Sequence, residues 1–456
     1  MRKGLGKWGQ VLVLGLLWGS AVQARREPEQ QALASEQRGW KSAGMLDTSF
    51  GRSGKVTTSI RGINDGILAM AVQKDGRIVA GGFSFNPDRA GGVQEFALAR
   101  YLPDGRLDPS FGSGGVVTSA FSESSDILRA LVLLEDGKIL AGGSSNGDYV
   151  LARYLPDGRL DPSFGAGGVV RTDFFADDDE IRAMALQKDG KIVAVGRSRA
   201  SRPDLDFSLA RYLPDGRLDP SFGNGGKVIL AVSDVDDEAN AVLILPDRDI
   251  VVGGRAGSPT DGDLALVRLD RHGRPDTSFG EGGLVVLDVA GGLDTVEDLV
   301  LQHCGKIVAV GSAVVPETGM DAVVARFDKR GRLDAGFGMA GITLIDFPGP
   351  GGVPGENGGA AAAVQKNDRI VVTGSVLLDP ELGDGDFGLF RLTRSGFLDG
   401  SFGTGGRVTT DFEGGTDVPN AMVLQRDCRI VAGGSIASRS GGSIFGLARF
   451  LGAPCN

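Results

Sequence analysis

Short apolar stretches with polar residues at intervening positions, separated by glycine-containing turns, run along most of the chain. The first group comprises KVTTSI (55–60), LAMAVQ (68–73), RIVAGG (77–82) and FALARYL (96–102). Segments of this length and pattern are typical of β-strands, and no stretch shows the periodicity of an amphipathic helix. Lys74-Asp75-Gly76 joins the second and third segments and is typical of a tight hairpin. The pattern therefore predicts a unit of four short antiparallel strands.

This unit occurs seven times, with three landmarks in each copy: a phenylalanine in an LDxSFG-like hexapeptide, an isoleucine after the hairpin, and an arginine in the last segment. The phenylalanines are 53 to 65 residues apart. Four antiparallel strands repeated at this spacing predict the blades of a β-propeller. We therefore expect an all-β fold, a seven-bladed propeller that spans residues 45–456 as one domain. The landmarks are Phe50, Phe111, Phe164, Phe222, Phe279, Phe337 and Phe402; Ile78, Ile139, Ile192, Ile250, Ile307, Ile370 and Ile430; and Arg100, Arg153, Arg211, Arg268, Arg326, Arg391 and Arg449.

Side-chain size predicts the order of strands within a blade. The segment before the hairpin carries alanine at one position in six units, and small side chains suit strands that crowd around an axis. The segment after the Phe-Gly pair is then the outermost strand. Because the last unit supplies only three strands, we expect residues 55–60 to pair beside residues 445–451, which closes the ring and protects its edges. The alanines are Ala69, Ala130, Ala183, Ala241, Ala361 and Ala421.

Composition adds constraints on function. Glycine accounts for 74 of 456 residues, against about 7% in an average protein, and many of these glycines recur at turns or close contacts. Only two histidines are present, His272 and His303, which argues against a multi-histidine metal centre and against catalysis. The formal net charge of −10 argues against binding to nucleic acid or anionic membranes.

The N-terminal residues are typical of an export signal. A basic start (MRKGLGK) precedes the apolar segment VLVLGLLW (11–18), and Val22 and Ala24 are small residues suited to cleavage. We expect a signal peptide over 1–24 and a flexible polar leader over 25–44. The apolar segment is about half as long as a spanning helix. We therefore expect an exported monomer, periplasmic or extracellular, without membrane insertion.

The recurring run LDxSFGxxGxV, QxDGKIVxxGG and FxLARYxPDGR resembles the delta-60 repeat family of secreted bacterial proteins. The resemblance covers about residues 45–456. It implies a β-propeller-like fold, no established activity, and no catalytic residues. Cys304 and Asn367 replace the hairpin aspartate and Cys428 replaces the hairpin glycine, which leaves the geometry of those turns open.

Segment lengths distinguish the two faces of the predicted disc. The arginine-to-phenylalanine interval is always 11 residues, whereas the isoleucine-to-arginine interval ranges from 14 to 22. The sixth unit also has extra residues in PGPGGVPGENGG (348–359). Both variable stretches fall on one face of an antiparallel blade, which we call the loop-variable face; the opposite, hairpin face carries the tight turns. Since function concentrates in loops, we expect the loop-variable face to bind a partner; the alternative is neutral length drift.

An acidic position just ahead of the innermost strand recurs in the units and forms a predicted axial ring. Carboxylates around a channel mouth suit a cation such as calcium. The alternative is that each aspartate caps its own loop, which recurrence in every blade favours. Asp298, in place of the fifth inner-strand alanine, is expected to add a carboxylate near the axis. The ring comprises Asp65, Asp126, Asp179, Asp237, Asp294, Asn357 and Asp417.

The landmark arginines lie on the apolar side of their strand, and a buried guanidinium needs a partner. The aspartates of the LDxSFG-like hexapeptides match them in number. We expect seven structural Arg–Asp pairs rather than ligand-binding arginines. The aspartates are Asp47, Asp108, Asp161, Asp219, Asp276, Asp334 and Asp399.

Three cysteines are present: Cys304, Cys428 and Cys455. The last two belong to the same blade and the same face, so a disulfide between them is a candidate that would close a loop of about 28 residues, worth ~3 kcal/mol on chain-entropy grounds. Cys304 would then be unpaired.

Together these features favour a non-catalytic propeller that binds a protein or glycan through its loop-variable face, with no cofactor unless calcium binds. One alternative is an envelope hydrolase or lyase that uses carboxylates near the central channel. Another is a calcium-dependent adhesion module. Convergence of the axial aspartates on one point would favour a cation; carboxylates turned to their own loops would disfavour it.

Overall fold

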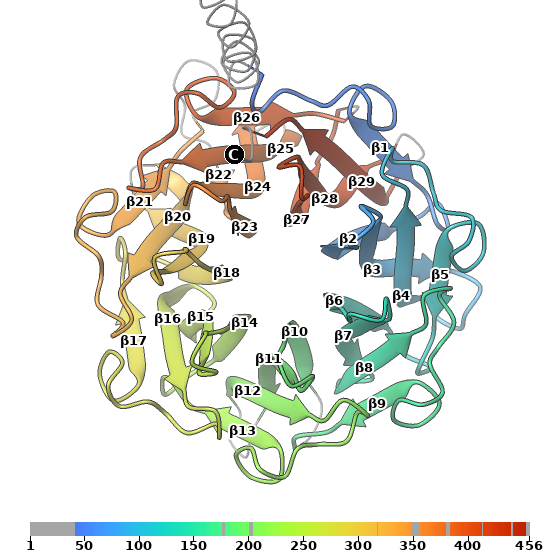
Figure 1. Ribbon diagram of the computed structural model, residues 1–456, viewed down its shortest axis with the longest axis horizontal. Helices are drawn as coiled ribbons and strands as arrows, with labels where there is room; N and C mark the ends of the chain where they lie inside the picture. The colour runs from blue at the N-terminus through green and yellow to red at the C-terminus, as the bar shows by residue number, and fades with distance from the viewer. Residues whose placement is uncertain are drawn as a thin grey trace, which may run out of the picture.

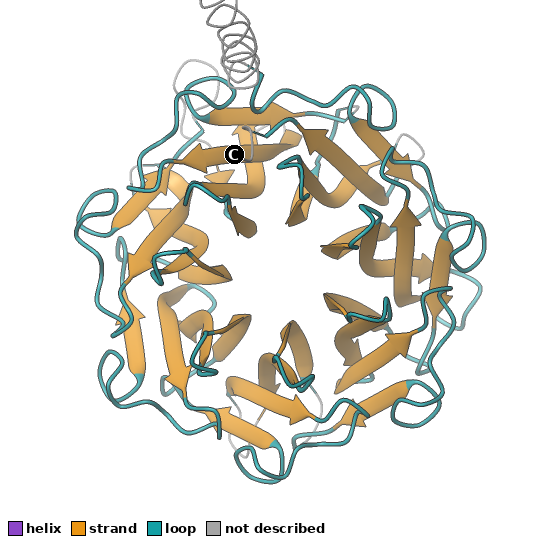
Figure 2. Ribbon diagram, viewed as in Figure 1, coloured by secondary structure: helices purple, strands orange, loops and turns teal. Residues whose placement is uncertain are grey.

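The computed structural model describes residues 42–175, 178–199, 204–316, 318–347, 356–379, 384–412, 414–438 and 441–452. Its strands form seven sheets around a central axis, and these described ranges contain no helix (Figure 1, Figure 2). The predicted all-β, seven-bladed propeller is therefore confirmed.

Each blade runs from an innermost strand at the axis to an outermost strand at the rim, in the predicted order. In blade 6 the innermost strand is divided in two. From the axis outward, the blades are β2 (Asp65–Val72), β3 (Ile78–Asn86), β4 (Val93–Tyr101) and β5 (Val116–Ser119); β6 (Asp126–Leu133), β7 (Ile139–Ser145), β8 (Asp148–Tyr154) and β9 (Val169–Thr172); β10 (Glu180–Leu186), β11 (Ile192–Arg199), β12 (Leu205–Tyr212) and β13 (Lys227–Leu230); β14 (Asp237–Ile244), β15 (Ile250–Ser258), β16 (Asp261–Leu269) and β17 (Leu284–Leu287); β18 (Asp294–Leu301), β19 (Ile307–Val315), β20 (Gly319–Phe327) and β21 (Ile342–Ile345); β22 (Glu356–Asn357) with β23 (Ala361–Val364), β24 (Ile370–Asp379), β25 (Asp384–Leu392) and β26 (Arg407–Thr410); and β27 (Val418–Leu424), β28 (Ile430–Ala437), β29 (Ser443–Phe450) and β1 (Lys55–Thr58).

Blade 7 joins the two ends of the propeller. The first strand, β1, pairs antiparallel with the last, β29, with Val56 opposite Leu447 and Thr58 opposite Phe445. In Figure 1 the blue β1 lies beside the dark red β29. The ring closes as predicted, although the paired strand ends at Thr58 rather than residue 60.

A β-bulge interrupts the innermost strand. In blade 1, Ile67 faces Gly82 and Ala69 faces Gly81, so Leu68 is the extra residue. The bulge brings backbone close to the second strand: a Cβ on Gly82 would lie 1.9 Å from the carbonyl oxygen of Gly66. This close approach explains why that glycine recurs in all seven units. Equivalent register shifts occur in blades 2, 3, 4, 5 and 7.

The hexapeptide builds a polar network on the hairpin face of every blade. In blade 2 the Arg153 Nε donates to Asp161 Oδ2 at 2.8 Å, and Nη2 donates to Ser163 Oγ at 3.0 Å. The Ser163 hydroxyl in turn donates to Asp161, while the guanidinium lies 4.5 Å above the Phe164 ring. Arg153 Nη1 also donates to Pro214 O of the next blade. One arginine thus ties its strand, its hexapeptide and the neighbouring blade together.

All seven arginines contact the aspartate assigned to them, with N···O distances of 2.8 to 3.1 Å. The pairs are Arg100–Asp108, Arg153–Asp161, Arg211–Asp219, Arg268–Asp276, Arg326–Asp334, Arg391–Asp399 and Arg449–Asp47.

The described chain begins inside the segment predicted as a leader. Ala43 is buried, Gly403 N donates to Ala43 O, and Gly44 N donates to Leu451 O. The packed chain therefore already includes Ala43. The predicted signal peptide (1–24) and the rest of the leader lie outside the described residues. Within the described ranges, no helix has the length and apolarity needed to cross a membrane.

The cysteines differ in state. Cys304 is free and exposed, whereas Cys428 is disulfide-bonded. Cys428 adopts a φ of 64° at the hairpin position that four other blades fill with glycine, so the turn keeps its shape despite the substitution. Cys455 lies outside the described residues, and its pairing with Cys428 stays a prediction.

Candidate functional site

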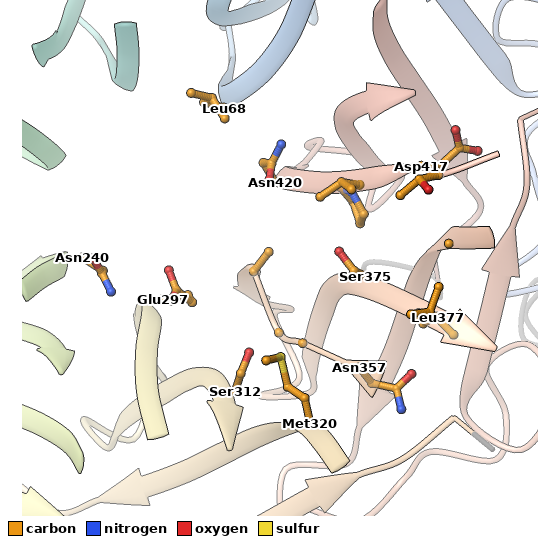
Figure 3. Close-up of a pocket in the computed structure, with 18 of the residues that line it drawn as sticks. Leu68, Asn240, Glu297, Ser312, Met320, Asn357, Ser375, Leu377, Asp417 and Asn420 are labelled. Atoms are coloured by element: carbon orange, nitrogen blue, oxygen red, sulfur yellow. The ribbon is translucent and has the colours of Figure 1, made fainter. Parts of the chain in front are cut away.

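A cavity of about 490 Å³ lies at the centre of the ring, on the side of blades 5, 6 and 7 (Figure 3). Thr416 and Val418, at the start of β27, form one wall, and Ser375 and Leu377 of β24 form another. These residues adjoin the connections of the loop-variable face. The cavity therefore sits where sequence analysis expected binding.

The bulge residue of six blades lines this cavity, as does Ala360, which precedes β23 in the divided strand of blade 6. The repeat places the same structural position seven times around the axis, yet the side chain there differs between most blades. Figure 3 shows several of these side chains around one central space. These residues were not among the predicted site residues, although each is recognisable in the sequence as the residue immediately before the inner-strand alanine position. The seven are Leu68, Arg129, Arg182, Asn240, Glu297, Ala360 and Asn420.

Two bulge amides hold adjacent blades together. Asn420 Nδ2 donates to Ile67 O at 2.8 Å, and Asn240 Nδ2 donates to Val296 O at 3.0 Å. Asn240 Oδ1 is buried without a hydrogen-bond partner in the described part of the chain. The Asn240 amide donor is therefore used by the scaffold, and its acceptor is left without a partner in the described residues.

A charged network covers the channel wall in blades 2 to 4. Glu180 forms ion pairs with Arg129 and with Arg182 (3.1 Å), and Arg182 also lies 3.6 Å from Glu238. Burial raises the pKa of Glu238, but the guanidinium groups of Arg182 and Arg197 outweigh it and the net pKa is lowered. Burial, with the nearby arginines, lowers the pKa of Arg182. The wall therefore presents fixed charges on one side and amides and hydroxyls on the other.

Glu297 and Asp298 are consecutive but serve different purposes. Glu297 lines the cavity, accepts from Thr295 Oγ1 at 3.2 Å, and has a pKa raised by burial. Asp298 accepts Ala362 N of blade 6 and Leu299 N, each at 2.8 Å. Burial raises the Asp298 pKa to about 6. Asp298 thus bridges two innermost strands, and Glu297 is the carboxyl that faces the cavity.

The predicted axial ring does not converge on one point of the channel. Its aspartates are 0–1% exposed, and each accepts the backbone N–H of the residue five positions earlier at 2.6 to 2.8 Å, as Asp126 does from Phe121. Asn357 instead donates to Asp346 Oδ1 at 3.1 Å. The ring members therefore cap their own loops at the junctions between blades. Only Asn357 and Asp417 of this set also line the cavity.

Three of these aspartates belong to acidic triads. In each triad, one oxygen from every carboxylate lies within 4.8 Å of the other two. Burial, reinforced by the neighbouring carboxylates, raises the pKa of Asp179 to about 7 and the pKa values of Asp294 and Asp417 to about 6. The triads are Asp148, Asp173 and Asp179; Asp263, Asp288 and Asp294; and Asp386, Asp411 and Asp417.

Solved structures with a similar arrangement have very different sequences. Virginiamycin B lyase from Staphylococcus aureus is 10% identical with a TM-score of 0.49, covering 86% of this chain and 98% of that one. The polysaccharide lyase Uly1 is 11% identical with a TM-score of 0.46, covering 90% and 97%. Sqt1 from Chaetomium thermophilum is 14% identical with a TM-score of 0.41, covering 85% and 96%.

Comparison of the sequence with known proteins and families yields a match to one family profile. No curated protein matches the chain. A family profile described as "Domain of unknown function (DUF5122) beta-propeller" matches residues 73–111, 134–164, 187–222 and 245–279. Each matched segment runs from a hairpin to the next phenylalanine landmark. The matches support a β-propeller repeat family of unknown function.

Proposed function

We propose that this protein is a non-catalytic binding propeller that takes a glycan through its loop-variable face, with a sugar unit seated in the central cavity. One observation carries the proposal: the bulge side chains that reach the cavity differ between blades, whereas the alanine beside them recurs in six of seven. A purely structural position in a repeat would keep one residue. Variation at a position that lines a cavity is expected where a scaffold has been adapted to a ligand.

The chemistry of the lining favours a sugar over an apolar ligand. Asn240, Asn420 and Ser375 supply amides and a hydroxyl, and Leu68 and Met320 supply apolar surface for the C–H faces of a ring. A volume of 490 Å³ falls within the ~300–1,000 Å³ typical of small-ligand sites. A protein partner that inserts a polar side chain is the alternative.

The test is binding of the purified propeller to an array of neutral and acidic oligosaccharides, followed by calorimetry on the hits. The variant Leu68→Trp fills the cavity with a larger side chain and is expected to weaken binding at least ten-fold. Lys74→Ala, on the hairpin face, is the matched control and should bind normally. Absence of any oligosaccharide ligand, or normal binding by Leu68→Trp, would contradict the proposal.

A hydrolase or lyase is the second candidate, and Glu297 is the observation that favours it. A cavity-facing carboxyl with a raised pKa has the property required of a general acid. Both histidines lie in exposed turns of the hairpin face, so they are not its partners. If the array yields a ligand that is cleaved, Glu297→Gln should abolish cleavage and retain binding. Retained cleavage in that variant would exclude this role for Glu297.

We also infer export and membership of the delta-60 type of repeat. Export rests on the basic start and apolar segment at the N-terminus, and the repeat type rests on the hexapeptide and arginine landmarks. Mass spectrometry of the protein from an exporting host tests the first inference. A mature chain that begins at Arg25 is the expected result, and an intact N-terminus would contradict it.

A further inference from the structure

We propose that three of the seven blade junctions are calcium sites, each formed by three aspartates that converge from two adjacent blades. The sites are the three triads described above, at junctions 2/3, 4/5 and 6/7. Two oxygens bound to one calcium at about 2.3–2.6 Å lie no more than about 5 Å apart. The spacing of 4.8 Å or less within each triad meets this condition.

The strand register shows that the three triads occupy the same structural positions. In blade 2, Tyr149 of β8 pairs with Thr172, the last residue of β9. Asp148 directly precedes the first of these residues and Asp173 directly follows the second. Asp179 then directly precedes β10, the innermost strand of the next blade. Leu264 with Leu287, and Phe387 with Thr410, place the other two triads in the same way.

Incomplete hydrogen bonding separates two of the three triads, those of Asp179 and Asp294, from ordinary acidic loops. Asp179 and Asp294 are fully buried, and each uses Oδ2 to accept a backbone N–H. Oδ1 of each carboxylate has no hydrogen-bond partner in the described ranges. Asp417 Oδ1 accepts Ala437 N at 3.1 Å. A buried carboxylate oxygen without a partner is costly, and a bound cation removes this cost.

Other junctions of the same molecule serve as internal controls. At junctions 1/2 and 3/4 the middle aspartate is replaced by Ala120 and Ala231. There a serine hydroxyl donates to the carboxylate: Ser122 to Asp126 Oδ1 and Ser233 to Asp237 Oδ1, each at 2.7 Å. The protein therefore satisfies this oxygen with a hydroxyl where the triad is absent, and not at Asp179 or Asp294, where the triad is complete.

The two remaining junctions also lack a complete triad, and a hydroxyl satisfies the carboxylate at one of them. At junction 7/1 the middle position is Ser59, and the Ser84 hydroxyl donates to Asp65 Oδ1 at 2.6 Å. At junction 5/6 the positions are Asp321, Asp346 and Asn357, so a neutral amide replaces one carboxylate. Junctions 1/2, 3/4 and 5/6 thus lack one carboxylate of the triad, and junction 7/1, where Ile444 and Ser59 occupy the first two positions, lacks two.

The donor set favours calcium among divalent cations. All three side-chain ligands are carboxylates, which suit a hard cation, and calcium completes its six to eight ligands with backbone carbonyls and water in protein sites. Magnesium requires near-ideal octahedral geometry and retains several waters, which two fully buried carboxylates do not favour. Each ion would join an outer strand of one blade to the inner strand of the next.

The test is calcium titration of the purified chain by calorimetry after chelation, with magnesium as the competing ion. Three calcium ions per chain are expected. The variant Asp288→Ala/Ala290→Ser gives junction 4/5 the Ala-Val-Ser sequence of junction 3/4. Its serine replaces the missing ligand, so the variant is expected to fold and bind two ions. Asn357→Asp completes a fourth triad and is expected to raise the number to four.

The proposal fails if the chain binds no calcium, if magnesium competes equally, or if the double variant still binds three ions. Circular dichroism of each variant establishes that it is folded before titration. Neither Asp263, Asp288 nor Asp294 lines the central cavity. A result that excludes calcium binding at junction 4/5 therefore does not contradict the proposed glycan site. Absence of a ligand on the glycan array likewise does not contradict the calcium sites.

Discussion

The two faces of the propeller use aspartate in opposite ways. On the hairpin face every hexapeptide aspartate meets an arginine of its own blade, and five of these arginines also contact the hexapeptide serine. On the loop-variable face, aspartates gather against one another at three junctions. Paired charges stabilise a scaffold, whereas a cluster of like charges is stable only with a counter-ion or protons. The contrast supports our proposal that the hairpin face serves stability and the loop-variable face binds ligands.

The largest expected effect comes from breaking a pair on the hairpin face. Arg153→Ala removes the guanidinium that reaches Asp161, Ser163 and the next blade. Loss of one partner from a buried ion pair costs about 3–5 kcal/mol, measurable as a shift in the denaturant midpoint of unfolding. Arg159→Ala is the matched control: Arg159 pairs with Asp157 in the same blade but is 78% exposed, so a change of under about 0.5 kcal/mol is expected. Equal stability of Arg153→Ala and wild type would show that the pair is not structural.

The pH dependence of stability should separate the two faces. In chelator, Asp179 has a folded pKa of about 7 because of burial and the charges of Asp173 and Asp148, which Lys227 offsets in part. Between pH 4 and 7 the folded chain holds a proton that the unfolded chain has released. The free energy of unfolding should therefore fall by about 3 kcal/mol from Asp179 alone as the pH rises through this range.

The stability contributed by the aspartates of the hairpin face changes with pH in the opposite direction. Burial opposes ionisation of Asp161, but its hydrogen bonds from Ser163 and the charge of Arg153 outweigh it and lower the pKa to about 2. The stability that the ionised Asp161 supplies is present above about pH 4 and is lost as the pH falls toward 2. Thermal unfolding in chelator should show a maximum near pH 4–5, and calcium should raise stability most at pH 7–8. A flat profile from pH 4 to 8 in chelator would contradict the repulsion inferred for the triads.

Adding a carboxylate to a control junction offers a smaller effect. Ala231→Asp places a third acid between Asp206 and Asp237 at junction 3/4. Without calcium we expect a loss of about 1–2 kcal/mol from like-charge repulsion and desolvation, and calcium should restore the loss. Thermal melts in chelator and in calcium measure both. A loss that calcium leaves unchanged would show that the position cannot complete a site.

The smallest effect is expected from removal of one hydroxyl. Ser122→Ala leaves Asp126 Oδ1 without the serine that donates to it at 2.7 Å. A lost hydrogen bond of this kind costs about 1 kcal/mol. Ser124→Ala, two residues away and exposed, is the control and should be neutral. Equal melting temperatures for the two variants would mean that the hydroxyl does not replace a missing cation.

Repetition decided which features the sequence could predict. Seven copies of the landmarks predicted the number of blades, the strand order and the closure by β1, because these depend on patterns that recur. The aspartate partners of the landmark arginines were predicted because the hexapeptide aspartates match these arginines in number. The division of the innermost strand in blade 6 could not be predicted, because its extra residues were recognisable only as an insertion.

The bulge and the triads required the register, which a pattern of apolar positions does not contain. Leu68 and Ala69 looked like consecutive strand residues until the pairing showed one to be unpaired. Asp179 was identified as a recurrent acid, but Asp148 lies 31 residues away in another strand. Which residues meet at a junction depends on where each strand ends, and this is known only from the paired backbone.

The pairing of β1 with β29 also governs how the chain reaches its folded state. Nearly the whole propeller lies between these strands, so their contact is among the most non-local in the molecule, and such contacts slow folding. The entropic cost of this closure grows only logarithmically with loop length. The closure is therefore limited by its rate rather than by its free energy. Until β29 joins the sheet, β1 is an unpaired edge strand that other chains can pair with. A chain truncated before Ser443 would retain that edge permanently and should associate rather than remain monomeric.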